Sequence, residues 1–459
     1  MAIVHRTAPP TLVGWVSEPD GRGTVSLLTT CLTTIFLCTW VVIHPRVYAS
    51  ETFATVHKLA LLLKTLLAPE FIAVEGLQEW AQCRRMVDDC APYSNGEFRL
   101  VHAYYVSMLA LRYREPQSET ETETETEPES ATENGGQNEH AGTKIIWPNQ
   151  YTWLLRQGLI TWTDTRAPWG MTVAQIRDRN KSDSITKLIT LFQVLWFVAT
   201  CIMRAANALP LSQLESMTLS YIPLFAITYF FWWEKPKDIL APSVVQLPTM
   251  SREQRAVFEQ MALSDRFDEG NAERSFWGVW ALTPRVFEKE ARDKALQEAR
   301  VRAAERGARV QRGLKSAVST TSEIQGPEDL EVELDKEIVV AHWDPGLYHS
   351  KIIRSLCSLF GASFGALHLA CWNTAFPTLA EKWMWRGSAF VSIVSLLAFM
   401  HYEKVVFRWE GFRTIVCIGS PGLYFLSRIV MMVEVFVTIR AVDPAIYDTY
   451  EIANYGIQL

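Results

Sequence analysis

The chain has 459 residues, of which 49% are apolar and 12% are aromatic, and its formal net charge is −6. Its apolar residues are concentrated in blocks of roughly 20, the length that a helix needs to cross a hydrocarbon layer of about 30 Å. This clustering excludes an ordinary soluble globular protein. The net charge comes mainly from the loops and indicates no particular partner, and we expect no nucleic-acid partner.

The apolar blocks predict an all-α fold, a polytopic transmembrane helical bundle of about seven spans. Thr24–Ile43 carries no charge and follows a polar leader without a convincing cleavage site, so we expect a retained span here. Weaker, more polar candidates follow at His57–Gln78 and Phe98–Leu111. The stronger blocks further along the chain are Leu188–Arg204, Leu214–Trp233, Ile352–Trp372, Ala389–His401 and Thr414–Ile439.

Two hydrophilic stretches separate these blocks. Ser118–His140 is acidic, repetitive and without large apolar residues, so its burial cannot offset the entropy of ordering and we expect disorder. In the second stretch, Glu288–Arg312 is rich in helix formers and predicts an exposed helix. The predicted units are N-terminal spans at 1–112, a disordered acidic linker at 113–145, central spans at 146–240, a hydrophilic loop at 241–349 and C-terminal spans at 350–459.

The orientation in the membrane stays open. The positive-inside rule counts short loops near span ends, and long loops cross largely regardless of charge. Asn180 begins the glycosylation sequon Asn-Lys-Ser, which matters only if its loop is lumenal.

Ionisable residues within apolar blocks are functional candidates, because desolvating a charge is costly unless the group is paired or lines a cavity. Glu70 follows Pro69, which frees a backbone carbonyl one turn back for a kink or a polar neighbour. Glu434 lies in the last block, with Arg428 and Arg440 six residues away on either side.

The stretch "HLACWNTAFPTLAEKWMWRGS" brings further polar groups into the apolar C-terminal quarter. His368 and Trp372 share a helical face and Asn373 is adjacent, so ring and amide are expected to converge on one cavity. A satisfied interhelical hydrogen bond would explain His368 equally well. Glu381 and Arg386 open the next span, as catalytic groups or as structural anchors.

Two other places combine rings and polar groups. "FRLVHAYYVSM" contributes His102 and two tyrosines, and "YFFWWEKPKD" contributes Tyr229, Trp232 and Trp233 beside charges at a span end. Tryptophan and tyrosine at span ends also form interfacial belts, and lysine there reaches toward headgroups, so an anchoring role is the alternative.

Neither a soluble-enzyme signature nor a cluster of acids that would hold magnesium against a diphosphate is present in the sequence. We therefore expect no metal ion and no cofactor. Carboxylic acids and aromatic rings in a membrane cavity suit proton-initiated cyclisation of a polyprenyl chain. A desolvated carboxyl group acts as the general acid, and aromatic faces stabilise the carbocation. A transporter cavity would look the same in sequence, so a non-enzymatic multi-pass protein, such as a transporter of a hydrophobic metabolite, is the alternative.

The combination of several blocks resembles a family of fungal multi-pass membrane proteins, which includes the membrane-bound terpene cyclases of the ascofuranone and macrophorin type. The resemblance covers the predicted spans and is carried by "GWVSEPDGRGTVSLL", "LAPEFIAVEGLQEWAQCRR", "HAYYVSM", "QVLWFVATCIMRAANALPLSQLE", "TYFFWWEKPKD" and "HLACWNTAFPTLAEKWMWRGS". It implies cyclisation of the terpenyl tail of a meroterpenoid by protonation of an epoxide or alkene. We also expect a lipophilic terpenoid substrate, contact with membrane lipid and an integral, multi-pass placement in the endoplasmic reticulum membrane.

The resemblance does not identify the proton donor, so the ranking rests on the residues themselves. Glu70 is the first candidate acid, followed by Glu381 and Glu434, and His102 and His368 are candidate orienters or bases. The candidate cation-stabilising and substrate-binding residues are Tyr229, Trp232, Trp233, Trp372 and Asn373.

Overall fold

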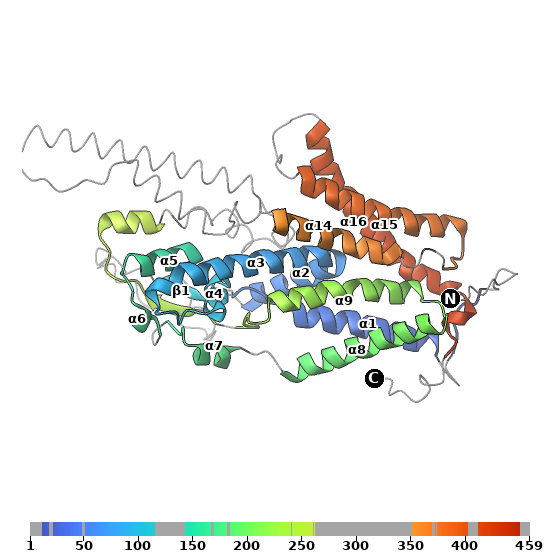
Figure 1. Ribbon diagram of the computed structural model, residues 1–459, viewed down its shortest axis with the longest axis horizontal. Helices are drawn as coiled ribbons and strands as arrows, with labels where there is room; N and C mark the ends of the chain where they lie inside the picture. Colours follow the sequence, from blue (N-terminus) through green and yellow to red (C-terminus); the bar gives the residue numbers. More distant parts are fainter. Residues whose placement is uncertain are drawn as a thin grey trace, which may run out of the picture.

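A computed structural model describes residues 12–17, 22–47, 51–114, 143–166, 169–180, 184–239, 241–259, 261, 351–369, 372, 374–402 and 412–449. The described chain is mostly helical, as predicted (Figure 1). The acidic stretch Ser118–His140, the expected helix Glu288–Arg312 and Asn373 lie outside these residues.

Among the described residues, four segments are long and apolar enough to cross a membrane: Thr24–Val42, Ile185–Ala206, Gln213–Phe231 and Gly419–Arg440. They belong to helices α1 (Thr24–Val42), α8 (Ser184–Ala206), α9 (Gln213–Phe231) and α16 (Phe412–Val437). Helices α14 (Lys351–His368) and α15 (Leu379–Tyr402) complete the bundle. Helix α9 packs against α1 and α14, and α15 packs against α14 and α16 (Figure 1). The predicted number of about seven spans is not confirmed.

The weak candidate span His57–Gln78 is not one helix. Helix α2 (Glu51–Leu67) ends before Pro69, and α3 (Pro69–Cys90) starts there, because proline lacks the N–H that would continue the helix. The two helices lie side by side as a helical hairpin, and the Lys64 ammonium group of α2 donates to the Glu75 carboxylate of α3. Its tip lies beside the middle of α9, since the Tyr221 hydroxyl donates to the Leu66 carbonyl. The hairpin therefore enters the bundle and returns to the same end.

The weak candidate span Phe98–Leu111 is also wrong. Helix α4 covers only Leu100–Ser107, which is too short to cross a bilayer. It belongs to a small α/β unit at the end of the bundle where α1 and α9 finish (Figure 1). The other elements of this unit are the one-turn helix η1 (Ala91–Tyr93), α5 (Pro148–Arg156), α6 (Trp162–Arg166), α7 (Val173–Arg179), a helix over 252–259 and the three strands β1, β2 and β3.

The strands correct the all-α prediction. Strand β1 (Leu111–Arg114) pairs antiparallel with β2 (Thr143–Ile145) and parallel with β3 (Ser243–Gln246), in the order β2-β1-β3. The sheet joins three of the predicted units. Strand β1 crosses the predicted boundary between residues 112 and 113, β2 ends at the boundary between 145 and 146, and β3 lies in the predicted hydrophilic loop at 241–349. Helices α5 to α7 likewise belong to this unit rather than to the membrane spans expected at 146–240.

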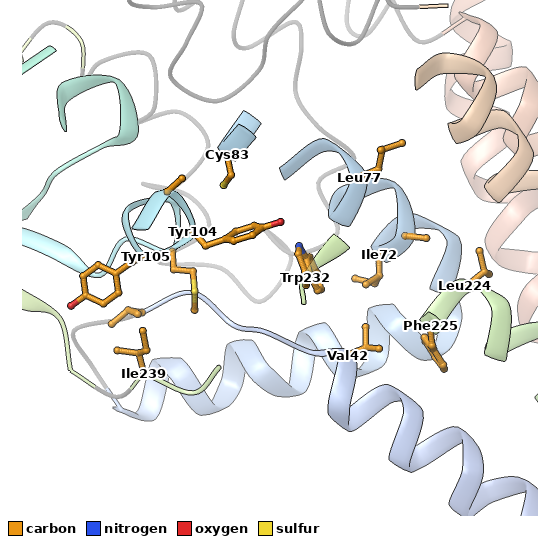
Figure 2. Packing of buried hydrophobic residues seen from close by; sticks show 14 of the residues in the cluster. Val42, Ile72, Leu77, Cys83, Tyr104, Tyr105, Leu224, Phe225, Trp232 and Ile239 are labelled. Atoms are coloured by element: carbon orange, nitrogen blue, oxygen red, sulfur yellow. The ribbon is translucent and has the colours of Figure 1, made fainter. Parts of the chain in front are cut away.

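A continuous apolar core links the small unit to the bundle. Figure 2 shows Tyr104 of α4 pointing toward Trp232 at the end of α9, with Ile72 and Leu77 of α3 close by. The Tyr104 hydroxyl donates to the Phe231 carbonyl at 2.7 Å. Helix α3 packs against α9 at Gly76, where a Cβ would make an ordinary contact with Thr228 at 3.4 Å.

The opposite end of the bundle brings the two ends of the described chain together. Val13 and Val442 exchange backbone hydrogen bonds of 2.9 and 2.8 Å. The one-turn helices η4 (Thr438–Arg440) and η5 (Pro444–Ile446) follow α16 at this end. Buried Arg204 donates to the carbonyls of Pro210, Ala445, Ile446 and Asp448, which ties α8 to the C-terminal segment. The N-terminal segment around Val13 and the C-terminal segment around Val442 therefore lie at the same end of the bundle.

Candidate functional site

Three layers of polar and aromatic side chains lie between the hairpin tip and helices α14, α15 and α16. We name them by depth from the end where α14 finishes. The outer layer contains Glu381, Arg440 and Glu434, the middle layer contains Phe364, His368, Phe376 and Trp385, and the inner layer contains Glu70, Tyr424 and Arg428.

The inner layer is a buried ion pair at the hairpin tip. The Arg428 guanidinium donates to both carboxylate oxygens of Glu70, and these side chains are 2% and 1% exposed. The Tyr424 hydroxyl donates to Glu70 Oε1 at 2.6 Å and accepts from Arg428 Nε at 3.1 Å. The arginine also lies over the Phe364 ring, 3.5 Å from its centroid. A carboxylate held by a bidentate guanidinium is stabilised as the anion.

The sequence explains why Glu70 lies there. Pro69 occupies the first turn of α3, where its missing N–H is not needed, and Glu70 follows in the same turn. An acidic side chain is favoured at a helix N-terminus, because the unpaired N–H groups give it partial positive charge. Tyr221 satisfies the Leu66 carbonyl at the break, as the proline in this block predicted.

The middle layer surrounds the last residue of α14. His368 is fully buried, and its Nδ1 lies 2.8 Å from the Phe364 carbonyl. Because a carbonyl only accepts, Nδ1 carries the proton, and in the neutral ring Nε2 has a free lone pair. Nε2 has no hydrogen-bond partner among the described residues. The imidazole centroid lies 4.3 Å from the Phe364 ring and 5.3 Å from the Trp385 ring.

The outer layer joins the start of α15 to the end of α16. Arg440 pairs with Glu381 Oε1, while Glu381 Oε2 and Glu434 Oε2 are buried without a hydrogen-bond partner in the described part of the chain. Glu434 is 4% exposed and lies within electrostatic range of Glu381 and Arg440. Glu434 is therefore a second buried carboxyl group near a guanidinium that is already paired with Glu381.

Glu381 and Trp385 lie one turn apart on α15, so this helix brings the Glu381 carboxyl group next to the aromatic middle layer. Trp385 is fully buried and donates from Nε1 to the His368 carbonyl at 3.2 Å. The structure thus places Glu381 one helical turn from the layer that contains His368, with Glu434 in electrostatic range of Glu381, and it places Glu70 one layer deeper.

His102 lies elsewhere, in the small α/β unit. It accepts the Arg99 N–H on Nδ1 at 2.8 Å and packs against Phe98 and Trp162, so it caps the start of α4. Burial lowers the pKa of His102 to about 4, with the Arg99 charge acting in the same direction. The structure does not place His102 near the other candidate acids and bases.

The predicted aromatic residues at the end of α9 also lie away from the three layers. Trp232 is buried under Lys235, whose Nζ lies 4.3 Å from the ring centroid and pairs with Glu79 at 2.6 Å. Trp233 is 66% exposed and meets Tyr229 edge-on at 5.3 Å. This placement favours the anchoring alternative for Tyr229 and Trp233.

Trp372 faces outward rather than into a cavity with His368. It is 43% exposed, and the Arg386 guanidinium stacks on it 4.0 Å from the ring centroid. Arg386 also donates to the Trp372 carbonyl, so the two residues brace the turn between α14 and α15. Asn373, the remaining candidate, is outside the described residues.

Sequence reasoning missed Tyr424 and Trp385 and treated Arg428 only as a neighbour of Glu434. A signal for Arg428 was present, since an arginine inside an apolar block requires a buried anion. Glu70 was the matching carboxylate. Tyr424 and Trp385 carry no such signal, because aromatic residues are common in membrane helices.

Among the described residues, no group of three or more His, Cys, Asp or Glu side chains could hold a metal ion.

The family model of a family of unknown function, DUF8562, matches residues 2–88, 167–298 and 347–425. These segments include the hairpin, α8, α9, α14, α15 and the first part of α16, and they omit the acidic stretch. No functionally described protein and no solved structure matches the chain. Because the matched segments cover more than half of its length, the chain belongs to the DUF8562 family.

Proposed function

We propose that this protein is an integral membrane terpene cyclase, which cyclises the terpenyl tail of a meroterpenoid after protonating an epoxide or an alkene. The observation that supports this proposal most is that a carboxyl group of the outer layer lies close to the aromatic rings of the middle layer. Glu381, whose Oε2 has no partner among the described residues, lies one helical turn along α15 from Trp385, and Trp385 packs against His368, whose Nε2 is also without a partner there.

In this proposal Glu434 is the acid. It is buried and its Oε2 has no partner in the described chain, whereas Glu381 is paired with Arg440. Glu434 would transfer its proton to the epoxide oxygen or alkene carbon, and the pair beside it would stabilise the carboxylate left behind. A carboxyl group poised in this way supplies general acid catalysis.

The middle layer would then stabilise the carbocation and accept the proton that the carbocation finally loses. The faces of Trp385 and Phe376 would stabilise a carbocation by about 2 kcal/mol each where water is excluded. His368 Nε2 would accept the proton that the cation loses when the final double bond forms. One proton enters the substrate and one leaves, so the product is an isomer of the substrate.

Glu70 ranks lower as the proton donor than its sequence suggested. Arg428 binds both of its carboxylate oxygens, so neither oxygen is free to contact a substrate. We assign Glu70 and Arg428 the task of fixing the hairpin tip against α16, directly behind Phe364.

We further propose a multi-pass arrangement in the endoplasmic reticulum membrane. Helices α1, α8, α9, α14, α15 and α16 would cross, and the α2–α3 hairpin would enter and return. This gives six crossings and leaves both described ends of the chain on one side, in agreement with the Val13–Val442 pairing. The lipophilic substrate would come from the surrounding lipid.

A transporter of a hydrophobic metabolite is the second candidate, and the hairpin favours it. Helices broken at membrane depth, with charged groups at the break, are typical of substrate sites in transporters. The break before Pro69, beside the Glu70–Arg428 pair, has this character.

The test is turnover in isolated membranes. Membranes that contain the protein should convert a farnesylated epoxide or alkene precursor into a cyclised product of the same mass, and Glu434→Gln should abolish it. The matched control is Glu259→Gln, which changes an exposed carboxylate of the small α/β unit and should leave the rate unchanged. If no precursor is cyclised while the protein is present and folded, the cyclase proposal fails.

A further inference from the structure

Lysines and aromatic rings gather on the surface of the bundle where it meets the small α/β unit. Figure 1 shows the start of α8 and the end of α9 on this side of the bundle. The Lys58 Nζ lies 4.4 Å from the ring centroid of Trp40, and the Lys187 Nζ lies 5.8 Å from that of Tyr229. We call this surface the basic patch and define it by Trp40, Lys58, Lys187, Tyr229, Trp233, Lys237 and Asp238.

Lys237 joins the α1–α2 half of the basic patch to the α8–α9 half. Its Nζ donates to the Trp40 carbonyl at 2.7 Å and to the Val41 carbonyl at 3.3 Å, so its charge lies at the negative end of the α1 dipole. Burial lowers the pKa of Lys237 to about 8, and the charges of Lys58 and Lys187 act in the same direction. The three ammonium groups are therefore near enough to one another to interact.

Carboxylates bind two of the lysines at this end of the bundle. Asp238 binds Lys58 at 2.9 Å, and both side chains are 24% exposed. Glu79 binds the buried Lys235 at 2.6 Å. Each of these acids is thus used by one lysine, and the Lys58–Asp238 pair is open to the surroundings.

Lys187 is the lysine that these carboxylates leave over. It is half-buried in the first turn of α8, and no carboxylate of the described chain lies within electrostatic range of it. Glu234, also in the turn after α9, is exposed and lies within electrostatic range of Tyr104 in the small α/β unit. The α8 side of the basic patch therefore presents a positive charge that the described residues do not neutralise, with Lys237 behind it.

The surface becomes apolar directly beside the basic patch. The side chains next to its lysines on α8 and α2 are more than half exposed: Leu188, Ile189, Leu191 and Phe192 on α8, and Leu59 on α2. Trp233, at the end of α9, is equally open. Lysines and aromatic rings next to exposed apolar side chains are typical of the level at which lipid headgroups meet the hydrocarbon.

We propose that the basic patch binds an anionic phospholipid. Lys187 contacts the phosphate, Lys58 and Lys237 add positive potential, and the acyl chains lie along the exposed apolar face of α8. A zwitterionic headgroup brings its own cation to this surface, so an anionic one is preferred. This inference rests on the membrane placement made under Proposed function and goes beyond it by naming the class of lipid.

Photolabelling in nanodiscs of phosphatidylcholine tests the patch. The probe is a trace of phosphatidylserine with a diazirine near the glycerol end of one acyl chain, and the comparison probe is phosphatidylcholine with the same chain. Phosphatidylserine should label peptides from α2, the start of α8 and the end of α9 about tenfold more, a difference of about 1.4 kcal/mol in binding. The preference should shrink in 1 M salt, where the screening length falls to about 3 Å.

Matched substitutions locate the charge that binds. Lys187→Gln should reduce labelling by phosphatidylserine about fivefold, the effect of one lysine near an anionic surface. Lys382→Gln makes the same change in the first turn of α15, at the opposite end of the bundle, and should leave labelling unchanged.

Asp238→Asn should have the opposite effect. It removes the acid that binds Lys58 and should raise labelling about fivefold. Asp238 has a φ of 53°, in the left-handed region that asparagine also adopts readily, so the backbone of this turn can be kept. Misfolding does not produce such a gain.

Equal labelling by the two lipids, or equal effects of Lys187→Gln and Lys382→Gln, overturns the proposal. Displacement of the label by soluble glycerophosphoserine also overturns it, because the site would then bind a free anion without needing acyl chains. Since labelling needs no turnover, a protein that is labelled as expected but cyclises no precursor would contradict the cyclase function and leave this lipid site standing.

Discussion

The ion pair between Glu70 and Arg428 should be the costliest single contact to break in the described bundle. Both side chains are almost fully buried, and the guanidinium contacts both carboxylate oxygens. Glu70→Gln removes the charge but keeps an oxygen that accepts from Tyr424. Arg428 would then be a buried cation without a counterion, which costs about 3–5 kcal/mol of unfolding free energy.

Removing both charges should cost less than removing one. Arg428→Met alone leaves the Glu70 carboxylate unpaired and should also lose about 3–5 kcal/mol. The double variant Glu70→Gln/Arg428→Met has no unpaired charge, and its remaining cost is the unsatisfied amide, about 1–3 kcal/mol. The two single losses should therefore be strongly non-additive.

Unfolding in mixed micelles with increasing sodium dodecyl sulfate, followed by tryptophan fluorescence, measures these free energies. The surface pair Arg255–Glu259, whose Nε and Oε1 are 2.7 Å apart, is the control and should contribute only about 0.3–0.5 kcal/mol. If each inner-layer variant loses no more than this control, or if the double variant loses the sum of the singles, the reasoning about the buried pair is wrong.

Three further predictions follow from the fold. The pKa of His102 in the folded state is about 4, below the ordinary 6.5. The contribution of the neutral ring to the free energy of unfolding is therefore complete above pH 6.5 and is lost as the pH falls toward 4. The difference in unfolding free energy between the parent and His102→Gln should thus shrink by about 2–3 kcal/mol from pH 7 to 4.5; an equal difference at both pH values contradicts this. Tyr221→Phe leaves the Leu66 carbonyl unpaired at the hairpin tip and should cost about 1–3 kcal/mol in the same assay, whereas a neutral effect would show that the break needs no donor. Epitope tags at the two ends of the chain should be either both digested or both protected in sealed microsomes, and the sequon at Asn180 should lie on the other side; tags on opposite sides contradict the pairing of Val13 with Val442.

Continuous apolar blocks made the long helices predictable. Helices α1, α8 and α9 match blocks of roughly spanning length because each block holds almost no charge over that length. The hairpin was misread as one span although Pro69 lies inside it. A hairpin of two helices has the same average composition as a single span of the same sequence. Only the break at the proline distinguishes the hairpin from a span.

The small sheet could not be predicted from local pattern. Each strand has only three or four residues, and β1 pairs with β3 from a segment about 130 residues further along. Pairings over such separations leave no periodic signal in one sequence.

The candidate site was predictable in its parts and not in its arrangement. Glu70, Glu381, Glu434 and His368 stood out as polar groups in apolar blocks. Whether each is paired depends on partners far away, as Glu70 and Arg428, which are 358 residues apart, show. That pairing, invisible in the sequence, moves the expected acid from Glu70 to Glu434.

Cyclisation of an alkene precursor in deuterium oxide tests the central claim most directly. A proton-initiated reaction transfers one deuteron from the enzyme's exchanged acid to carbon and releases one hydrogen from the cation. The product should therefore carry one carbon-bound deuterium in the unmodified protein, and no product should form with Glu434→Gln. A cyclised product without deuterium, or undiminished turnover in Glu434→Gln, would contradict the account.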